Sequence, residues 1–158
     1  MRIGFASDIH RLAGGRKLML GGVDVPHYQG EVAHSDGDVV YHALAESILG
    51  ALALGDLGTH FPDSDPQYKD IDSSKLAKQV VKMMNDKGYV VGNVDISISL
   101  EEPKLKPHIQ KMRENIANLL EVEVEQVSVK AGTNENLDAV GMRLAVKAES
   151  IVLLKEKE

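Results

Sequence analysis

Residues 94–131 read VDISISLEEPKLKPHIQKMRENIANLLEVEVEQVSVKA, and this stretch decides the fold class. Apolar and polar residues alternate over residues 94–100 and again over residues 127–131, which is the pattern of a half-buried strand. Between them, after Pro107, apolar residues recur every three or four positions, as in an amphipathic helix: Ile109, Met112, Ile116, Leu119 and Leu120. A strand, a helix and a second strand in succession indicate an α/β fold built in layers.

The rest of the chain continues this alternation of strand and helix patterns. We predict strands over residues 2–8, 17–25 and 142–149 and helices over residues 39–52 and 73–88. The first two strands could form a hairpin with a bulge or turn at Gly21–Gly22, and Ser73 is the expected cap of the second helix. Residues 55–70 are rich in Gly, Pro and Asp and predict a long loop without regular structure, of the kind that often carries function.

Composition favours a small enzyme with one domain over residues 1–158. The chain has 158 residues, is 43% hydrophobic and contains no cysteine, so a metal site would have to use His, Asp and Glu. A net charge of −6 and 4% aromatic residues argue against nucleic acid as a partner. Neither a signal sequence nor an apolar run long enough to span a membrane is present, so we expect no membrane partner and a cytoplasmic protein.

Asp8, His10 and His42 are candidate metal ligands. On a strand, residues two apart share a face, so Asp8 and His10 could both reach one ion, and His42 in the following helix would complete a site with three ligands. Two imidazoles and one carboxylate suit Zn²⁺ and leave a fourth position for water or a substrate oxygen. Taken alone, the spacing of Asp8 and His10 also describes an ordinary polar strand end.

Two polar loops could bind phosphate. Residues 34–38 (His-Ser-Asp-Gly-Asp) approach the helix over residues 39–52, where free backbone N–H groups could meet an anion; a plain helix cap explains the same residues equally well. Residues 132–136 (Gly-Thr-Asn-Glu-Asn) follow the last strand of the opening stretch. There Glu135 could bind Mg²⁺ together with substrate phosphates, and the alternative is a polar turn.

Many short motifs, in one order and without gaps, resemble the 2-C-methyl-D-erythritol 2,4-cyclodiphosphate synthase family. They span nearly the whole chain: Arg2–Phe5 with Asp8–His10, Leu20–Val23, Ala33–Leu44, Ala53–Gly58, Phe61–Asp63, Gly88–Asp95, Pro103–Lys104, Pro107–Ile109 and Val129–Ala131 with Thr133 and Glu135. The resemblance implies a single α/β (α+β) domain with a mixed four-stranded sheet, a small N-terminal hairpin and helices on one face. It also implies a homotrimer whose sheets face the threefold axis and whose active sites lie between subunits.

The activity implied by the resemblance is a metal-assisted intramolecular phosphoryl transfer in non-mevalonate isoprenoid biosynthesis. The 2-phosphate of 4-diphosphocytidyl-2-C-methyl-D-erythritol 2-phosphate attacks the β-phosphate, so that CMP leaves and the 2,4-cyclodiphosphate closes. The enzyme would be a phosphorus-oxygen lyase. Two other functions stay open: a zinc-dependent nucleotide-diphosphate hydrolase, and a trimeric binding protein without turnover.

The resemblance also assigns roles to residues. Asp8, His10 and His42 would hold Zn²⁺, Glu135 would hold Mg²⁺ or Mn²⁺ with the substrate phosphates, and His34 and Thr133 would be the catalytic residues. The implied substrate contacts are Asp8, His10, His34, Ser35, Asp56, Leu57, Gly58, Phe61, Asp63, Asp65, Pro103, Lys104, Ala131, Gly132, Thr133, Asn134 and Glu135. The chain departs from the family pattern at Gly132, Asp138, Ala139 and Met142, where Met142 stands in place of an arginine that belongs to an anion site near the axis.

Overall fold

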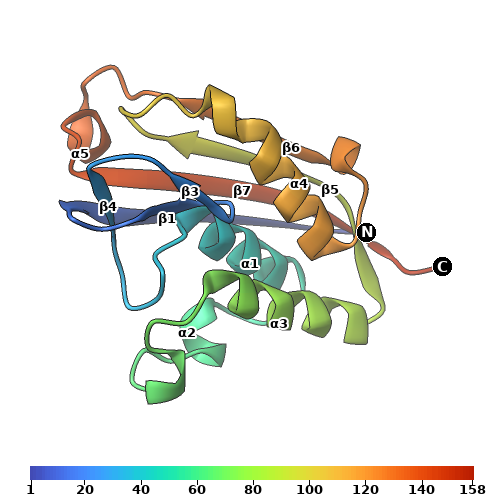
Figure 1. The fold of residues 1–158 in the computed structure, drawn as a ribbon. Coiled ribbons are helices and arrows are strands. Elements are labelled where there is room, and N and C mark those ends of the chain that lie inside the picture. Colours follow the sequence, from blue (N-terminus) through green and yellow to red (C-terminus); the bar gives the residue numbers. More distant parts are fainter.

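A five-stranded mixed sheet with the strand order β4-β1-β7-β5-β6 organises the computed structural model, which describes residues 1–158 (Figure 1). Its strands are β1 (Arg2–Gly14), β4 (Gln29–Val32), β5 (Tyr89–Ser99), β6 (Val127–Gly132) and β7 (Ala145–Glu156). β5 and β6 are parallel, whereas β7 pairs antiparallel with both β1 and β5. A separate hairpin consists of β2 (Leu18–Leu20) and β3 (Val23–Val25).

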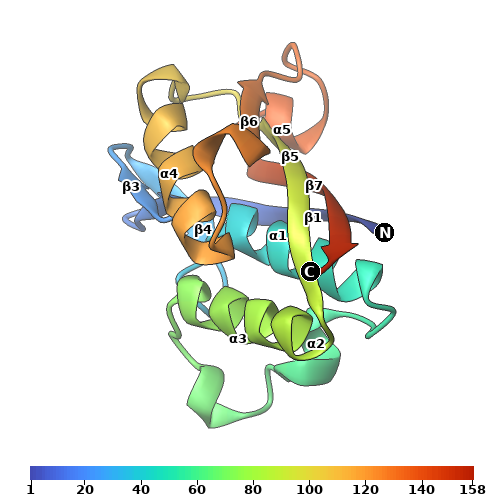
Figure 2. The same ribbon diagram turned by 90° about the vertical axis from the view of Figure 1, so that its right-hand side faces the viewer.

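Helices cover one face of the sheet. The main ones are α1 (Val39–Ala51), α3 (Ser73–Asp86) and α4 (Ile109–Leu120). Figure 1 shows α1 and α3 below the strands, and Figure 2 shows α4 next to α1 and α3. The shorter elements are α2 (Leu57–His60), α5 (Asp138–Gly141), η1 (Pro66–Tyr68), η2 (Lys106–His108) and η3 (Val124–Gln126). None of the helices has the length and apolar character that crossing a bilayer requires. The predicted α/β class and the placement of helices on one face are confirmed.

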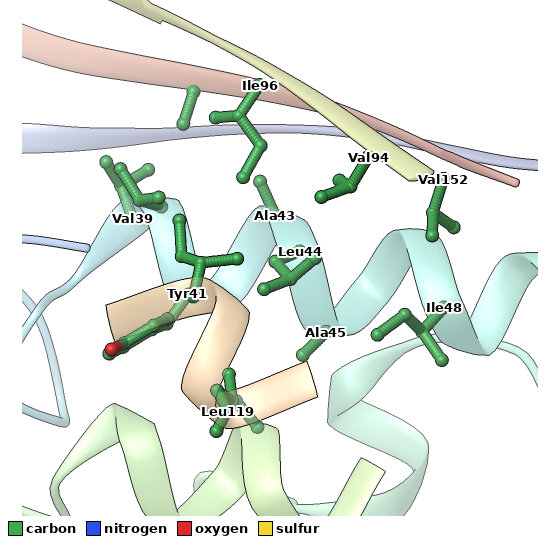
Figure 3. Close-up of a cluster of buried hydrophobic side chains, with 14 of the residues drawn as sticks. Val39, Tyr41, Ala43, Leu44, Ala45, Ile48, Val94, Ile96, Leu119 and Val152 are labelled. Carbon is green, nitrogen blue, oxygen red and sulfur yellow. The ribbon is translucent and has the colours of Figure 1, made fainter. Parts of the chain in front are cut away.

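The apolar core lies between α1 and the sheet. Leu44 and Ile48 of α1 meet Val94 and Ile96 of β5 and Val152 of β7, all of them almost completely buried (Figure 3). Because side chains alternate along a strand, the same strands turn their other side chains away from the helices. This alternation puts Asp8 and His10 of β1 on the helix side, as the period of two predicts.

The opposite face of the sheet is bare and partly apolar. Ile3, Phe5 and Ile9 of β1 are 71%, 59% and 53% exposed, and Ile151 of β7 is 47% exposed. Phe5 and Ile151 are direct partners across the β1–β7 ladder, so these side chains lie together on that face. An apolar sheet face of this kind needs a second surface to cover it.

Several predicted boundaries are wrong. The sheet has five strands, not four. β4 was missed because it is only four residues long and has no clear alternating pattern. Residues 2–8 do not pair with residues 17–25; instead β2 folds onto β3 across Gly21 and Gly22, both of which have positive φ. Through this turn the two short strands form their backbone hydrogen bonds with each other, and β1 is left to pair with β4 and β7.

Three further segments differ from the predictions. The loop over residues 55–70 contains two short helices, α2 and η1, each capped by an aspartate. Asp72, not Ser73, caps α3, since its side chain accepts a hydrogen bond from the backbone N–H of Ser74. The last strand begins at Ala145 and not at residue 142, because α5 ends just before and Arg143 takes a positive φ of 62°.

Candidate metal centre and cavities

Asp8, His10 and His42 converge in the structure. His10 Nε2 lies 3.1 Å from Asp8 Oδ2, His42 Nδ1 lies 3.6 Å from the same oxygen, and the two ring nitrogens are 3.3 Å apart. Donor atoms held 2.0–2.2 Å from a tetrahedral ion lie about 3.3–3.6 Å from one another. The three atoms are therefore spaced as ligands of one tetrahedral ion, and the residues fit a zinc-type centre.

Hydrogen bonds fix which nitrogen of each histidine faces the centre. His10 Nδ1 lies 2.6 Å from the carbonyl oxygen of Gly37, so this nitrogen keeps its proton, and Nε2 is the atom that offers a lone pair once the ring is neutral. His42 Nε2 lies 2.9 Å from Ser73 Oγ and 3.1 Å from Ser35 Oγ, which leaves Nδ1 facing the centre. The Ser73 hydroxyl in turn donates to Asp36. Such partners orient ligand imidazoles before an ion arrives.

The electrostatics of the pair Asp8 and His10 favour the charged forms. Burial opposes charge on both, but the hydrogen bonds from His10 and His42 outweigh it and lower the pKa of Asp8 well below its usual range. Burial likewise lowers the pKa of His10, yet the carboxylates of Asp8 and Glu31 reverse this effect and raise it to about 10. The chain without an ion thus holds a proton at the place that a cation would take.

Asp38 holds together the elements around this centre. Its fully buried carboxylate accepts hydrogen bonds from the backbone N–H groups of Val40 and Tyr41, so that it caps α1. The same carboxylate accepts from Gly21 N at 3.0 Å and Gly22 N at 2.7 Å in the turn of the β2–β3 hairpin. One side chain therefore fixes the start of the helix that carries His42 against that hairpin.

The three ligands line a cavity of about 370 Å³, which we call the first cavity. It also contains His34 and Ser35, and α2 supplies Leu57 and Gly58. Phe61 and Asp63 complete its wall, and the Phe61 ring packs edge-on against Tyr68 with centroids 5.4 Å apart. Residues from the predicted functional loop therefore do reach the candidate metal centre.

A separate second cavity, also of about 370 Å³, lies at the ends of β5 and β6. Its lining includes Pro103, Lys104, Ala131, Gly132 and Thr133. The loop after Thr133 is held by Glu101, whose carboxylate oxygens accept hydrogen bonds from Asn134 N at 3.1 Å and Asn136 N at 3.2 Å.

The two cavities lie apart within one chain. Asp8 pairs with Ala148, Ala148 with Ile98, and Ile98 with Ala131, so Asp8 and Ala131 share one row of the sheet with two strands between them. At about 4.8 Å per strand, they are about 14 Å apart. The cavities have no lining residue in common.

The other predicted site residues have different places. Asp56 and Asp65 line neither cavity and cap α2 and η1. Asn134 and Glu135 also lie outside both linings, and the Glu135 carboxylate is exposed 3.5 Å from Thr133 Oγ. The structure does not bring Glu135 to the three metal ligands.

Several residues of the site were not predicted from the sequence. Glu31 is buried 3.7 Å from His10 Nδ1, Ser73 contacts His42, and Glu101 holds the loop after β6. Glu46 also lines the first cavity and accepts a hydrogen bond from the backbone of Leu57. Of these four residues, only Glu46 could have been suspected from the sequence, because it follows His42 by four residues on one helix. The contacts of Glu31, Ser73 and Glu101 join segments that lie far apart in the chain.

Comparison with known proteins gives one consistent answer. The model of the YgbB family matches residues 1–155. A protein from Syntrophomonas wolfei named 2-C-methyl-D-erythritol 2,4-cyclodiphosphate synthase is 51% identical over 156 residues, which is 99% of each chain. A protein of the same name from Chloroherpeton thalassium is 52% identical over 156 residues, again 99% of each chain.

Solved structures agree with the sequence matches. A 2C-methyl-D-erythritol-2,4-cyclodiphosphate synthase in a form bound to CDP superposes with a TM-score of 0.91 at 34% identity, covering 98% of this chain and all of the other. The CDP complex of the Plasmodium falciparum protein gives a TM-score of 0.88 at 34% identity and covers 99% and 97% of the two chains.

Proposed function

The chain belongs to the YgbB family, that of the 2-C-methyl-D-erythritol 2,4-cyclodiphosphate synthases, and we propose that it performs their reaction in a site built from two copies of itself. The family relationship places the chain in isoprenoid biosynthesis as a cyclodiphosphate synthase. The observation that carries the proposed chemistry is the spacing of Asp8, His10 and His42, which matches the ligand set of a tetrahedral metal ion.

In the proposed reaction, an oxygen of the substrate 2-phosphate forms a bond to the β-phosphorus. The bond from that phosphorus to the oxygen bridging toward the α-phosphate breaks, and CMP leaves with the electron pair. The product is the eight-membered 2,4-cyclodiphosphate, so the enzyme is a phosphorus-oxygen lyase. Both reacting groups are anionic, so the protein must mainly align them and offset their charge.

Asp8, His10 and His42 would hold Zn²⁺, and Glu135 would hold Mg²⁺ or Mn²⁺ together with substrate phosphates. Bound there, the two cations would neutralise phosphate charge and polarise the phosphorus under attack. His34 and Ser35 line the first cavity beside the ligands and can donate hydrogen bonds to phosphate oxygens. Thr133 offers a hydroxyl at the rim of the second cavity, and we assign it with His34 to stabilising the transition state.

The remaining contacts divide between the two cavities. Leu57, Gly58, Phe61 and Asp63 would bind the methylerythritol part in the first cavity. Asp56 caps the helix that presents Leu57 and Gly58, and Asp65 caps η1, whose Tyr68 packs on Phe61. In the second cavity, the residues that would take the cytidine group are Pro103, Lys104, Ala131 and Gly132, with the backbone of Asn134 nearby. Similar chains that were solved with CDP support a nucleotide ligand.

A second copy of the chain would complete the site. Within one chain the two cavities are about 14 Å apart across the sheet. The bare apolar face with Ile3, Phe5 and Ile151 offers a surface for association with further copies. We therefore propose a homotrimer with the sheets turned inward, in which the first cavity of one subunit meets the second cavity of its neighbour. A cytoplasmic location remains a prediction.

The test is ³¹P NMR of the purified chain with 4-diphosphocytidyl-2-C-methyl-D-erythritol 2-phosphate, Zn²⁺ and Mg²⁺. Signals of a cyclic diphosphate and CMP are expected, and they should be absent for His42→Ala. His108→Ala is the matched control, because His108 lies outside both cavities. Thermal unfolding of each variant checks that it is folded.

Other outcomes would favour the other functions. Release of CMP with a linear diphosphate, with no cyclic product, would mean that water attacks and that the chain is a hydrolase. An unchanged substrate spectrum from folded, metal-loaded protein that still binds CDP would identify a binding protein. The departures at Met142 and Ala139 lie before β7 and outside both cavities, so they leave the proposed reacting groups in place.

A further inference from the structure

A third cavity lies outside the site described above, between the β2–β3 hairpin, α3 and α4. Its volume is about 420 Å³, and it shares no lining residue with the first or the second cavity. We call it the outer cavity, and its lining is Met19, Gly22, Asp36, Tyr41, Asp72, Ser74, Lys78, Asn115, Asn118 and Leu119. A volume in this range is suited to a small molecule.

Tyr41 gives the outer cavity a nearly buried side chain whose hydroxyl has no partner within the chain. The residue is only 5% exposed, and its hydroxyl makes no hydrogen bond within the chain. Figure 3 shows the ring extending from α1 with its oxygen turned away from the apolar cluster, and the residue lines the cavity. The oxygen is not among the fully enclosed atoms of the chain, so its hydrogen-bonding capacity is open to a ligand in the cavity.

The lining is rich in hydrogen-bond acceptors. Asp36 and Asp72 line the cavity from two different segments, and the Asp36 carboxylate also accepts hydrogen bonds from Ser73 and from the backbone of Asp38. Asn115 uses its side-chain nitrogen to donate to the carbonyl oxygen of Gly21, which leaves its amide oxygen free. Asn118 makes no side-chain hydrogen bond within the chain and adds a second amide.

Charge selects the kind of ligand. The carboxylates of Asp36 and Asp72, with Asp38 buried behind them, outnumber the single exposed cation of Lys78. The pKa of the Tyr41 hydroxyl is raised, first by burial and then by the negative charges of Asp38, Asp72 and Asp36. The contribution of these charges agrees with a negative potential in the cavity. Such a potential repels phosphates and other anions and attracts cations.

We propose that the outer cavity is a binding site for a small organic cation that carries a primary ammonium group. An ammonium group has three donors, which can meet Asp72, Asp36 and an asparagine amide oxygen at once. The Tyr41 hydroxyl oxygen is a fourth acceptor that can take the place of one of these three, and Leu119 and Met19 pack against the carbon chain.

The outer cavity reaches the metal centre through one carboxylate. Asp36 accepts the hydrogen bond of Ser73, which contacts His42. The binding site is nevertheless independent of the proposed reaction, because none of the metal ligands lines it. Binding can therefore be measured on the metal-free chain. Failure of the ³¹P NMR test of the proposed reaction would not affect the result.

The probe is 1,4-diaminobutane, titrated at constant ionic strength into the ¹⁵N-labelled metal-free chain, with 1,4-butanediol as the uncharged control. We expect saturable shifts of the side-chain amide signals of Asn115 and Asn118 and of the backbone amide of Ser74, with the diamine and not with the diol. Equal shifts with both compounds, or no saturable shift at these three residues, would overturn the proposal. Saturation by Mg²⁺ but not by the diamine would also overturn it, in favour of a metal site.

Variants locate the binding. Asp72→Asn keeps a capping side chain for α3 but removes one charge, and should weaken binding about two- to fivefold, as expected of a partly exposed ion pair. Tyr41→Phe should weaken it about two- to tenfold through loss of one hydrogen bond, without loss of thermal stability, since the hydroxyl has no partner in the chain. Glu125→Gln removes an exposed carboxylate elsewhere and should leave binding unchanged. Equal weakening in Glu125→Gln would mean that only net charge matters and would contradict the proposed site.

Discussion

The Nδ1 atom of His10 lies 2.6 Å from the carbonyl oxygen of Gly37, although 27 residues separate them in the sequence. This contact holds the His10 ring so that Nε2 points toward Asp8 and His42. Gly37 has a φ of +83°, and a Cβ atom there would lie 2.7 Å from Glu31 Cβ. A residue with a side chain therefore does not fit at this position unless its neighbours move. The geometry of the candidate metal centre thus depends on a residue that has no side chain.

Gly37→Ala should therefore weaken metal binding. The added methyl group must move either Glu31 or the backbone carbonyl that orients His10, and loss of such outer contacts typically lowers metal affinity about 10- to 100-fold. Zinc affinity is measured by competition with a chromophoric chelator. Gly15→Ala is the matched control, since Gly15 also has positive φ, +75°, but has no atom within 4 Å of the added Cβ. Equal affinity in Gly37→Ala and the parent chain would show that the carbonyl does not orient the ligand.

Zinc binding should strengthen as the pH rises from 6 to 8. The pKa of His10 is raised to about 10 in the metal-free chain, so over this range its proton must leave before Nε2 can bind an ion. Each released proton makes the affinity rise about tenfold per pH unit. Calorimetry in buffers of different ionisation enthalpy counts the protons released. His108→Ala should show the same dependence, whereas an affinity independent of pH would argue against displacement of the His10 proton.

The same carboxylate-histidine pair also affects the stability of the metal-free chain. Because the folded pKa of His10 lies above its usual 6.5, its protonated form stabilises the fold fully below about pH 6.5. This contribution is lost as the pH rises through about 10. Metal binding and metal-free stability should therefore change in opposite directions with pH.

The sequence patterns predicted those helices and strands that have a strong hydrophobic period and clear end signals. The helix over residues 39–52 and the strand over residues 127–131 appear within one residue of their predicted ends, because each has a strong period and a clear boundary. β4 could not be predicted, since four residues carry no measurable period and the strand exists only through its pairing with β1. The strand start at residue 142 was wrong because Arg143 takes a left-handed conformation that its sequence does not indicate.

The candidate site was predictable where the spacing is short. Asp8 and His10 share a strand face, and this follows from the period of two alone. Glu31 and Ser73 could not be found in this way, because their contacts with His10 and His42 depend on how distant segments pack. The sequence also could not show that the residues around Thr133 lie in a different cavity from the metal ligands.

Asp38→Ala should lower the free energy of unfolding by about 3 kcal/mol, since it removes a helix cap and leaves backbone N–H groups of the hairpin without a partner. The carboxylate accepts four backbone hydrogen bonds, from Gly21, Gly22, Val40 and Tyr41. Urea unfolding followed by circular dichroism measures the change. Asp72→Ala, which removes an exposed cap with one backbone partner, should cost only about 1 kcal/mol. A similar loss in the two variants would show that the link to the hairpin adds no stability.

Mixing two inactive variants should restore activity if each site draws on two chains. His42→Ala damages the first cavity and Thr133→Ala the second, so each variant alone should have little activity. When the two are unfolded and refolded together, a His42 from one chain can meet a Thr133 from its neighbour. Random mixing into trimers gives about one intact site in four, and therefore about a quarter of the activity of the parent chain. A mixture of His42→Ala with His10→Ala, both in the first cavity, is the control and should stay inactive. If the first mixture also stays inactive while its sedimentation mass matches that of a trimer of the 17.2 kDa chain, the two cavities must work within a single subunit.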